Sequence, residues 1–361
     1  MRLLVLASAD VVHARRWTAY FLERGHEVRL ATLEPSEESL TGEIALPVRS
    51  RIQWLKYLLA APALKELIRT FQPELVNAHF VSGYGFLAAR VGSVRPLALS
   101  AWGSDILLNP QRSPLHRLRT RYALRKAALV TCDAGVVSAA LAKLGVCQGK
   151  ILQVPMGIDP AVFHPPGNVS PPRAGKPLKI ISTRRLEPIY GLPTALEAAA
   201  ILNSRHIEFE LTIVSEGSAK ETLERRSREL GLEGRVIFRG ALVQSELAAA
   251  LREADIYLSA SLSDSTSVSL LEAMGSGVFP VVSDIPGNRE WVEDSRNGLL
   301  FPPGDPSALA GCLIRAGEEP GLRTNAAAIN REQIQRKAIW KDNMRLVEDK
   351  FLELAETGKK Y

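Results

Sequence analysis

The chain has 361 residues, of which 46% are hydrophobic and 23% charged, and its net charge is +6 at pH 7. This length suits two domains of ordinary size, each with its own core. No run of about 18 uncharged apolar residues occurs, which argues against a transmembrane helix. Cys132, Cys147 and Cys312 are too scattered for a disulfide framework or a zinc site, so we expect a reduced, cytoplasmic setting.

Short β-type runs alternate with helical stretches in the first part of the chain. This alternation predicts a parallel sheet covered by helices, in a domain over residues 1–165. The first run is bounded by no small-residue cleavage site, so we interpret it as a buried strand and not as a signal peptide. The runs lie at residues 3–7, 28–33, 75–80, 96–102, 128–133 and 151–155.

A basic stretch follows the fourth of these runs. Residues 112–126 hold six Arg or Lys residues and no acidic residue, with leucines and a tyrosine interleaved in a helical pattern. Together with the apolar stretch 51–59, this favours either an anionic membrane surface or an ordinary solvated helix face. No aromatic platform for stacked bases accompanies the charges, so we do not expect nucleic acid as a partner.

Polar side chains follow two of the predicted strands in the first domain. In open parallel sheets ligands bind beyond the carboxyl ends of the strands. Asp10 and His13 come directly after the first strand, and His79 ends the third, next to a Ser-Gly turn. His13 is either a ligand contact or an ordinary helix-start residue, and we predict that His79 faces a cleft between two domains.

A second alternating series begins after a segment rich in proline and glycine, residues 165–177, which is typical of a linker. The series predicts a second parallel-sheet domain over residues 178–340. The helical pattern of residues 331–356 continues into a last segment, 341–361, which we expect to pack back on the first domain. The β-type runs of the second series are 179–184, 210–217, 235–240, 255–261 and 279–284.

Residues 254–284 carry the most specific pattern. An apolar strand ends in small polar residues, and we predict that Ser265, Thr266 and Ser267 form the first turn of a helix. The free N–H groups and positive dipole end of a helix start attract phosphate. Asp264 and Glu272 flank this start and would lie about 12 Å apart along a continuous helix. Taken singly, the first carboxylate is more often an N-cap and the second a surface charge.

These residues resemble the retaining glycosyltransferases of family 4, which have the GT-B fold. Their signature is Glu, seven residues, Glu, then Ala-Met and a small-residue turn into Pro-Val-Val; here Asp264 and Glu272 take the acidic positions. Residues 155–163, 287–305 and, more weakly, 21–28 extend the resemblance. It implies an α/β architecture of two Rossmann-like, doubly wound domains facing across a cleft.

The resemblance also implies roles in binding a nucleoside-diphosphate sugar. Asp264 would orient the sugar, Glu272 would bind the ribose, and amides between them would hold the diphosphate. In residues 182–191, Arg184 or Arg185 would neutralise the leaving group, while Tyr190 stands where lysine is usual. The catalytic set is then Asp264, Arg184, Arg185 and His79, and the donor-binding set is Tyr190, Gly217, Ser265, Thr266, Ser267, Val268 and Glu272.

The segment 101–107 resembles the family's His-Gly-Ser-Asp segment, with Trp102 in place of the histidine. An indole stacks on a sugar face but donates only one hydrogen bond. Asp105 is either a contact to an acceptor hydroxyl or an N-cap. The predicted acceptor-binding set is Asp10, His13, Trp102, Ser104 and Asp105.

The expected function is transfer of a hexose-type sugar, with retention, from a nucleotide sugar to a saccharide or lipid-linked acceptor in polysaccharide or glycolipid biosynthesis. We expect no cofactor or metal, because backbone dipoles and arginine would stabilise the negative charge of the diphosphate. Peripheral membrane attachment is a further expectation. A nucleotide-sugar hydrolase or epimerase and a non-catalytic binding module remain alternatives. A dehydrogenase is disfavoured, because ASADVV replaces the Gly-X-Gly-X-X-Gly loop after the first strand.

Overall fold

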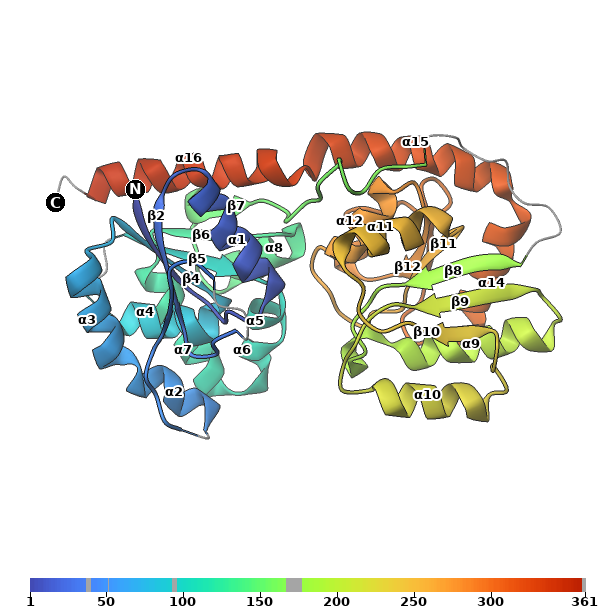
Figure 1. Ribbon diagram of the computed structural model, residues 1–361, viewed down its shortest axis with the longest axis horizontal. Helices are drawn as coiled ribbons and strands as arrows, with labels where there is room; N and C mark the ends of the chain where they lie inside the picture. The colour runs from blue at the N-terminus through green and yellow to red at the C-terminus, as the bar shows by residue number, and fades with distance from the viewer. Residues whose placement is uncertain (37–39, 51, 93–95, 167–176, 359–361) are drawn as a thin grey trace. The chain divides into compact units, whose positions relative to one another are not determined.

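The computed structural model describes residues 1–36, 40–50, 52–92, 96–166 and 177–358 (Figure 1). The chain forms two compact units: unit 1 is Met1–Pro155 with Asp342–Tyr361, and unit 2 is Met156–Lys341. The division falls ahead of the predicted linker, most of which, residues 167–176, lies outside the described residues.

Unit 1 is built on a seven-stranded sheet in the order β3-β2-β1-β4-β5-β6-β7, with every neighbouring pair parallel. Six of these strands match the predicted runs, while β3 was not predicted. The chain order reverses between β1 and β4, which is the switch point where such sheets bind ligands. The strands are β1 (Arg2–Leu6), β2 (Glu27–Thr32), β3 (Glu43–Ala45), β4 (Leu75–His79), β5 (Leu97–Ala101), β6 (Leu129–Cys132) and β7 (Ile151–Gln153).

Helices cover this sheet. One π-helix, η1, follows β4 directly, and its first residue, Phe80, has a positive φ of 65°. The basic stretch forms one helix, α7, apart from Arg112, which ends α6. Ser113 between them is extended and caps α7 by accepting a hydrogen bond from the amide of His116. The elements are α1 (Val12–Glu23), α2 (Gln53–Leu59), α3 (Ala61–Phe71), η1 (Phe80–Gly85), α4 (Phe86–Val91), α5 (Ser104–Leu107), α6 (Asn109–Arg112), α7 (Pro114–Lys126), α8 (Gly135–Lys143) and η2 (Gln148–Lys150).

Unit 2 is built on a six-stranded parallel sheet in the order β10-β9-β8-β11-β12-β13. Five strands match the predicted runs, and β13 was not predicted. Successive residues of a strand point to opposite faces, so Ile180 packs in one buried cluster with α9 and α14, and Ile181 in another with α11 and α12. The strands are β8 (Leu178–Ser182), β9 (Phe209–Ile213), β10 (Val236–Phe238), β11 (Ile256–Ser259), β12 (Phe279–Ser283) and β13 (Leu299–Phe301).

The helices of unit 2 cover both faces of its sheet. Among the residues that the structure describes, no helix is both long and apolar enough to cross a membrane. The elements are η3 (Pro188–Tyr190), α9 (Leu192–Ser204), α10 (Lys220–Glu229), α11 (Gln244–Glu253), α12 (Val268–Gly275), α13 (Pro286–Arg289), α14 (Pro306–Glu318) and α15 (Pro320–Lys337).

The helical pattern near the end of the chain forms two helices, because Ile339 leaves the helix to pair with Ile158. The last helix, α16 (Trp340–Gly358), belongs to unit 1 from Asp342 onward. There Glu348, only 3% exposed, accepts hydrogen bonds from the Tyr20 hydroxyl at 2.9 Å and from Arg24. Phe351 stacks on Phe21 with ring centroids 5.6 Å apart. A buried ion and a buried ring therefore fix this helix to α1.

Candidate active site

The loop of residues 260–267 joins β11 to α12 in unit 2. Ser267 is the N-cap of α12, and its Oγ accepts a hydrogen bond from the amide of Leu270 at 3.3 Å. The helix begins at Val268, so Ser265 and Thr266 lie in the loop ahead of it. The prediction that they form the first helical turn is therefore wrong. The side chain of Ser267 accepts the hydrogen bond from the Leu270 amide that a backbone carbonyl would accept if the helix began earlier.

Glu272 is the fifth residue of α12 and is half-buried. Asp264 lies four residues before the helix begins, so the spacing of about 12 Å along one continuous helix does not apply. The two carboxylates still flank the small polar residues of the loop. The amide of Ser265 donates to Oδ1 of Asp264 at 3.0 Å, which fixes the first carboxylate against its own backbone.

Arg184 connects the end of β8 to the 260–267 loop. Its guanidinium donates from Nη2 to Oδ2 of Asp264 and from Nη1 to Oγ of Ser267, each at 2.5 Å. The residue is only 7% exposed, and its charge lies over the ring of Tyr190, 4.2 Å from the centroid. Arg184, predicted to neutralise the leaving diphosphate, and Asp264, predicted to orient the donor sugar, are thus bonded to each other.

The electrostatics of this pair follow from its burial. Burial raises the pKa of Asp264, and the positive charge of Arg184 opposes that rise. Burial works to lower the pKa of Arg184, but Asp264 together with Tyr257 and Tyr190 outweighs it, so the pKa is raised. Arg184 is therefore a fixed cation that neutralises the loop's carboxylate. The adjacent Arg185 is exposed.

Glycines let other segments approach the loop. A Cβ on Gly287 would lie 2.0 Å from the carbonyl oxygen of Ser265, so α13 packs directly on the loop backbone. Trp291 then donates from its indole nitrogen to Oγ1 of Thr266 at 3.3 Å. Gly217 packs instead on the backbone of Leu186, where a Cβ would lie 2.5 Å from its oxygen. Neither Gly287 nor Trp291 was predicted as a site residue, although both lie in the segment 287–305 that carried the resemblance.

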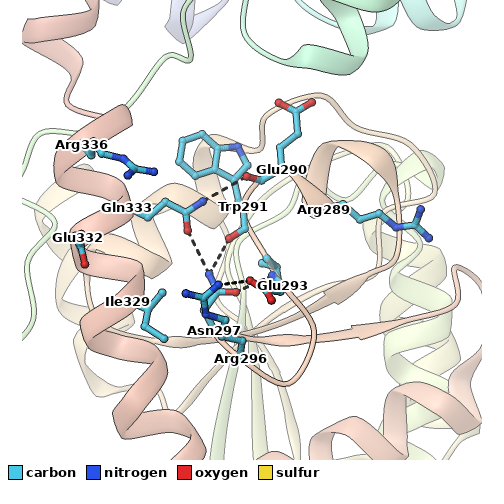
Figure 2. A pocket seen from close by; sticks show the side chains of 11 residues that line it. Arg289, Glu290, Trp291, Glu293, Arg296, Asn297, Ile329, Glu332, Gln333 and Arg336 are labelled. Atoms are coloured by element: carbon cyan, nitrogen blue, oxygen red, sulfur yellow. Dashed lines mark hydrogen bonds and ion pairs between the residues drawn. The ribbon is translucent and has the colours of Figure 1, made fainter.

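Unit 2 also has a polar cavity of about 320 Å³ between residues 289–297 and α15 (Figure 2). Asn297 donates to the carbonyl of Trp291 at 2.8 Å and to Gln333 at 3.3 Å. Within the described part of the chain, no predicted site residue lines this cavity. The hydrogen bonds of Asn297 therefore connect the loop to α15.

Unit 1 has an apolar pocket of about 380 Å³ at the carboxyl ends of β1, β2, β4 and β5. It brings together three predicted residues, His13, His79 and Trp102. The rings of His13 and Trp102 stack with centroids 5.6 Å apart and an interplanar angle of 18°. His79 lies 5.3 Å from Trp102, centroid to centroid.

His79 is held in one tautomer by its neighbours. Its Nε2 lies 2.9 Å from Oδ1 of Asn77, whose amide nitrogen donates to Oγ of Ser100 at 3.0 Å. An amide oxygen only accepts, so Nε2 carries the proton and Nδ1 is left as an acceptor. Burial, with the nearby charge of His13, lowers the pKa of His79 to about 3, so its imidazole is neutral at physiological pH.

Asp105 does not line the pocket, but it holds the backbone of Trp102, which does. It is fully buried, and its two carboxylate oxygens accept hydrogen bonds from the amides of Val81 at 2.7 Å and Trp102 at 3.0 Å. The N-cap of α5 is Gly103, so Asp105 fits neither predicted role. Burial raises its pKa to about 6, and these backbone hydrogen bonds oppose the rise.

Two other predicted acceptor residues, Asp10 and Ser104, are exposed and do not line the described pocket. The pocket has instead three residues that the sequence reasoning missed: Glu34, Tyr57 and Tyr84. The hydroxyl of Tyr84 donates to the carboxylate of Glu34 and accepts from the amide of Leu33 at 2.8 Å. Glu34 follows β2, so its position at a strand's carboxyl end was the available signal.

Two parallel-sheet units, each with its candidate ligand loops at strand ends, define the GT-B class of fold. Residues 169–333 match the family "Glycosyl transferases group 1" and residues 2–134 match "Glycosyl transferase 4-like". The second unit therefore resembles the group 1 glycosyltransferases, and the first resembles the glycosyltransferase 4-like family.

Curated relatives that match parts of this chain are named glycosyltransferases. The amylovoran biosynthesis glycosyltransferase AmsK of Erwinia amylovora is 35% identical over 49% of this chain and 44% of its own length. The putative colanic acid biosynthesis glycosyltransferase WcaL of Escherichia coli is 28% identical over 81% of this chain and 67% of its own. The chain thus spans about half to two thirds of these relatives' lengths.

Two solved structures share the fold across nearly the whole chain. Sucrose-phosphate synthase from Thermosynechococcus elongatus has a TM-score of 0.85 and 18% identity, over 99% of this chain and 100% of that one. Anabaena HepE in complex with UDP-glucose has a TM-score of 0.79 and 18% identity, over 100% of both chains.

Proposed function

We propose that the protein transfers a hexose-type sugar from a nucleoside-diphosphate sugar to a hydroxyl of a saccharide or lipid-linked acceptor, in polysaccharide or glycolipid biosynthesis. The observation that carries this proposal is the 260–267 loop, a small-residue loop ending at a helix start with a carboxylate at each side. The two family matches support the same chemistry. The relatives named for amylovoran and colanic acid biosynthesis favour the polysaccharide class.

Each element of the loop has a role in this proposal. The backbone amides at the start of α12, from Val268 onward, bind the diphosphate together with the positive end of the helix dipole. Asp264 orients the hydroxyls of the sugar, and Glu272 binds the ribose. Arg184 positions Asp264, and the exposed Arg185 stabilises the departing diphosphate.

We propose that transfer retains the anomeric configuration, with the acceptor hydroxyl attacking the face that the diphosphate leaves and a phosphate oxygen taking its proton. The reaction as proposed needs no metal, since the helix start and Arg185 supply positive charge. Within the described residues, no group of three or more His, Cys, Asp or Glu is arranged to hold a metal ion.

The test is sugar transfer from a panel of UDP-, GDP- and ADP-sugars to acceptors extracted from membranes and polysaccharide. UDP-glucose is the first choice, because HepE shares the fold and was solved with it. Asp264→Ala should abolish transfer, and NMR of the product's anomeric proton reports retention or inversion. Nucleotide release without any glycosylated product would identify a hydrolase or epimerase instead, and binding without turnover would identify a binding module. Full activity in excess EDTA is expected, and its loss would contradict the metal-free mechanism.

We further propose that unit 1 attaches to an anionic membrane surface through α7. Leu115, Leu118 and Tyr122 are 60%, 66% and 38% exposed, and their spacing places them on one face of the helix. By helical geometry Arg121 and Arg125 border this apolar face on the side of Leu118. An apolar face bordered by guanidinium groups matches the boundary between lipid headgroups and acyl chains.

Flotation with vesicles of phosphatidylglycerol and phosphatidylcholine tests this attachment. We expect binding that falls as salt rises, no binding to phosphatidylcholine alone, and loss of binding in the double variant Arg121→Glu, Arg125→Glu. The matched control is Arg225→Glu with Arg228→Glu on α10 in unit 2, which should float like the wild type. Equal loss in both double variants would reduce the effect to net charge and refute α7 as the docking helix.

A further inference from the structure

A connected group of elements in unit 1 carries positive charge without any acidic residue. The group consists of α2, η1, α4, α6 and α7, in which α4 and α7 pack side by side (Figure 1). These five elements hold eight Lys or Arg residues and no Asp or Glu, whereas the net charge of the whole chain is only +6. The rest of the chain is therefore net negative, and the positive charge is concentrated in this group.

These charges are not neutralised by the chain itself. Among the residues that the structure describes, none of the eight forms an ion pair with a carboxylate, and the ion pair nearest in sequence, Arg69 with Glu66, lies on α3. The helix α10 of unit 2 is also basic, but there Lys220, Arg225 and Arg226 each pair with a glutamate. The cations of the group in unit 1 are therefore available to an anion from outside the chain.

Arg119 of α7 is half-buried against α4. Its guanidinium carbon lies 4.7 Å from the centroid of the Phe86 ring, and Arg90 approaches the same ring at 5.9 Å. In the described part of the chain, the buried Nε of Arg119 has no hydrogen-bond partner. Burial lowers the pKa of Arg119, and the neighbouring Tyr57 opposes this shift without help from a carboxylate. Because a partly desolvated cation without an anion is costly, an anion from outside would be stabilised here.

Two guanidinium groups at one ring favour a particular class of anion. A guanidinium group matches the oxygens of a phosphate with a planar fork of N–H donors. Phe86 supports both Arg90 and Arg119, so two positive charges are held close together. A phosphate diester carries one negative charge, whereas a phosphate monoester or a diphosphate carries about two. The pair of arginines therefore matches a monoester or a diphosphate better than a diester.

The two arginines are continuous with the apolar face of α7. Arg119 lies four residues after Leu115 and three before Tyr122, so the three side chains share one side of the helix. Tyr122 packs edge to face on Phe86, with ring centroids 5.9 Å apart. A phosphate bound at Arg119 would therefore have exposed apolar side chains beside it. These suit the hydrocarbon chains of a lipid, which a free phosphate lacks.

We propose that Arg90 and Arg119, supported by Phe86, bind the phosphate group of a membrane lipid and prefer a monoester or diphosphate to a diester. This site is distinct from Arg121 and Arg125, which border the other side of the apolar face and attract any anionic surface. The inference rests on the proposed attachment of unit 1 through α7, and it names the lipid group that the attached protein recognises.

Flotation of the full chain with phosphatidylcholine vesicles tests this preference. The vesicles contain either phosphatidic acid, a monoester, or phosphatidylglycerol, a diester, in amounts adjusted to equal zeta potential. We expect binding to the phosphatidic acid vesicles to be at least about tenfold tighter, the ratio that one additional charge-assisted hydrogen bond gives. Arg119→Lys should bind the two kinds of vesicle about equally, because lysine keeps the charge but not the planar fork.

Matched variants separate the site from net charge. Arg119→Gln and Arg117→Gln remove the same charge from the same helix, but Arg117 is exposed and lies over no ring among the described side chains. Only Arg119→Gln should lose the preference for phosphatidic acid, and Arg90→Gln should reduce it in part. None of these substitutions should lower the Tm, because none of them breaks an ion pair.

The outcomes separate this inference from the proposals on which it rests. Equal binding of the wild type to both vesicles, or equal losses in Arg119→Gln and Arg117→Gln, contradicts the phosphate site and leaves the attachment through α7 standing. No binding to either vesicle refutes the attachment and this inference with it. Release from phosphatidic acid vesicles by an equal concentration of glycerol 3-phosphate assigns the site to soluble phosphates and overturns the lipid as its source. Sugar transfer to a soluble acceptor depends on none of these results, so the proposed transferase function is decided by its own test.

Discussion

Removal of the buried cation in unit 2 should destabilise that unit strongly. In Arg184→Met the aliphatic volume is kept, but Asp264 loses the partner that holds it at 2.5 Å. Breaking a buried ion pair costs about 3–5 kcal/mol, and the Asp264 side chain keeps 17% exposure, so we expect a value near the lower end, about 3 kcal/mol. For a domain of the size of unit 2, Met156–Lys341, this corresponds to a fall in Tm of about 6–12 °C.

Differential scanning calorimetry of three variants isolates the cause. The double variant Arg184→Met, Asp264→Asn should recover most of the lost stability, because it removes the unpaired charge. Arg289→Met is the control, since it breaks an ion pair with Asp284 in which the arginine is 62% exposed, and we expect a loss below about 1 kcal/mol.

The pH dependence supplies a second check. Without Arg184, nothing of comparable strength opposes the burial that raises the pKa of Asp264. The folded variant then binds a proton more tightly than its unfolded chain, so it regains stability as the pH falls through the raised pKa. The deficit relative to wild type should therefore be larger at pH 8 than at pH 5. If Arg184→Met loses no more than Arg289→Met, or if the double variant is no more stable than the single one, the ion pair does not hold this loop.

Three further predictions concern the surroundings of the two sites. Gly287→Ala places a Cβ 2.0 Å from the carbonyl oxygen of Ser265, so we expect a loss of about 1–3 kcal/mol and weaker nucleotide binding by calorimetry, whereas Gly311→Ala, with open space around its Cβ, should leave binding unchanged. Asp105→Asn sets an NH₂ group against a backbone N–H and should cost about 1–3 kcal/mol. Because burial raises the pKa of Asp105 to about 6 from 3.8, its contribution to wild-type stability falls as pH rises through that interval, and urea titrations from pH 4 to 7 should show this slope in the wild type only. Tyr190→Leu should lower the Tm by removing a cation–π contact of about 1–2 kcal/mol with Arg184, while Tyr190→Phe keeps the ring and should not; equal effects would show that the hydroxyl, not the ring, matters.

Periodicity alone predicted most of both sheets, because strands of four to six residues carry enough apolar positions to be recognised. The two strands it missed, β3 and β13, have three residues each. β7 and β10 are equally short, but they were recognised from the longer predicted runs 151–155 and 235–240. The start of α12 was misplaced for another reason. Ser265, Thr266 and Ser267 all suit a helix start, and only the side chain that bonds the amide of Leu270 decides which of them is the cap.

The sequence likewise predicted some residues of the candidate site and missed others. His13, His79 and Trp102 were found because each sits near a strand end or in a motif. Tyr57 and Tyr84 come from helices that pack over the same strand ends, and nothing local in the sequence indicates that they meet. The pairing of Arg184 with Asp264 is likewise a contact across 80 residues of sequence, which spacing does not reveal.

The pairing of Arg184 with Asp264 also bears on Tyr190, which stands where the family usually has lysine. Against the family pattern, Tyr190 looks like the loss of a lysine and of one positive charge at the donor loop. The neighbouring sequence has two arginines where the pattern needs one, and the structure separates them: Arg184 is buried against Asp264 and Tyr190, and Arg185 is exposed. A lysine at 190 would place a second cation against Arg184, whose charge is already matched by one carboxylate. The tyrosine instead covers the guanidinium with a ring face, which stabilises a cation without adding charge. In this chain the tyrosine therefore suits a loop whose buried arginine already supplies one positive charge.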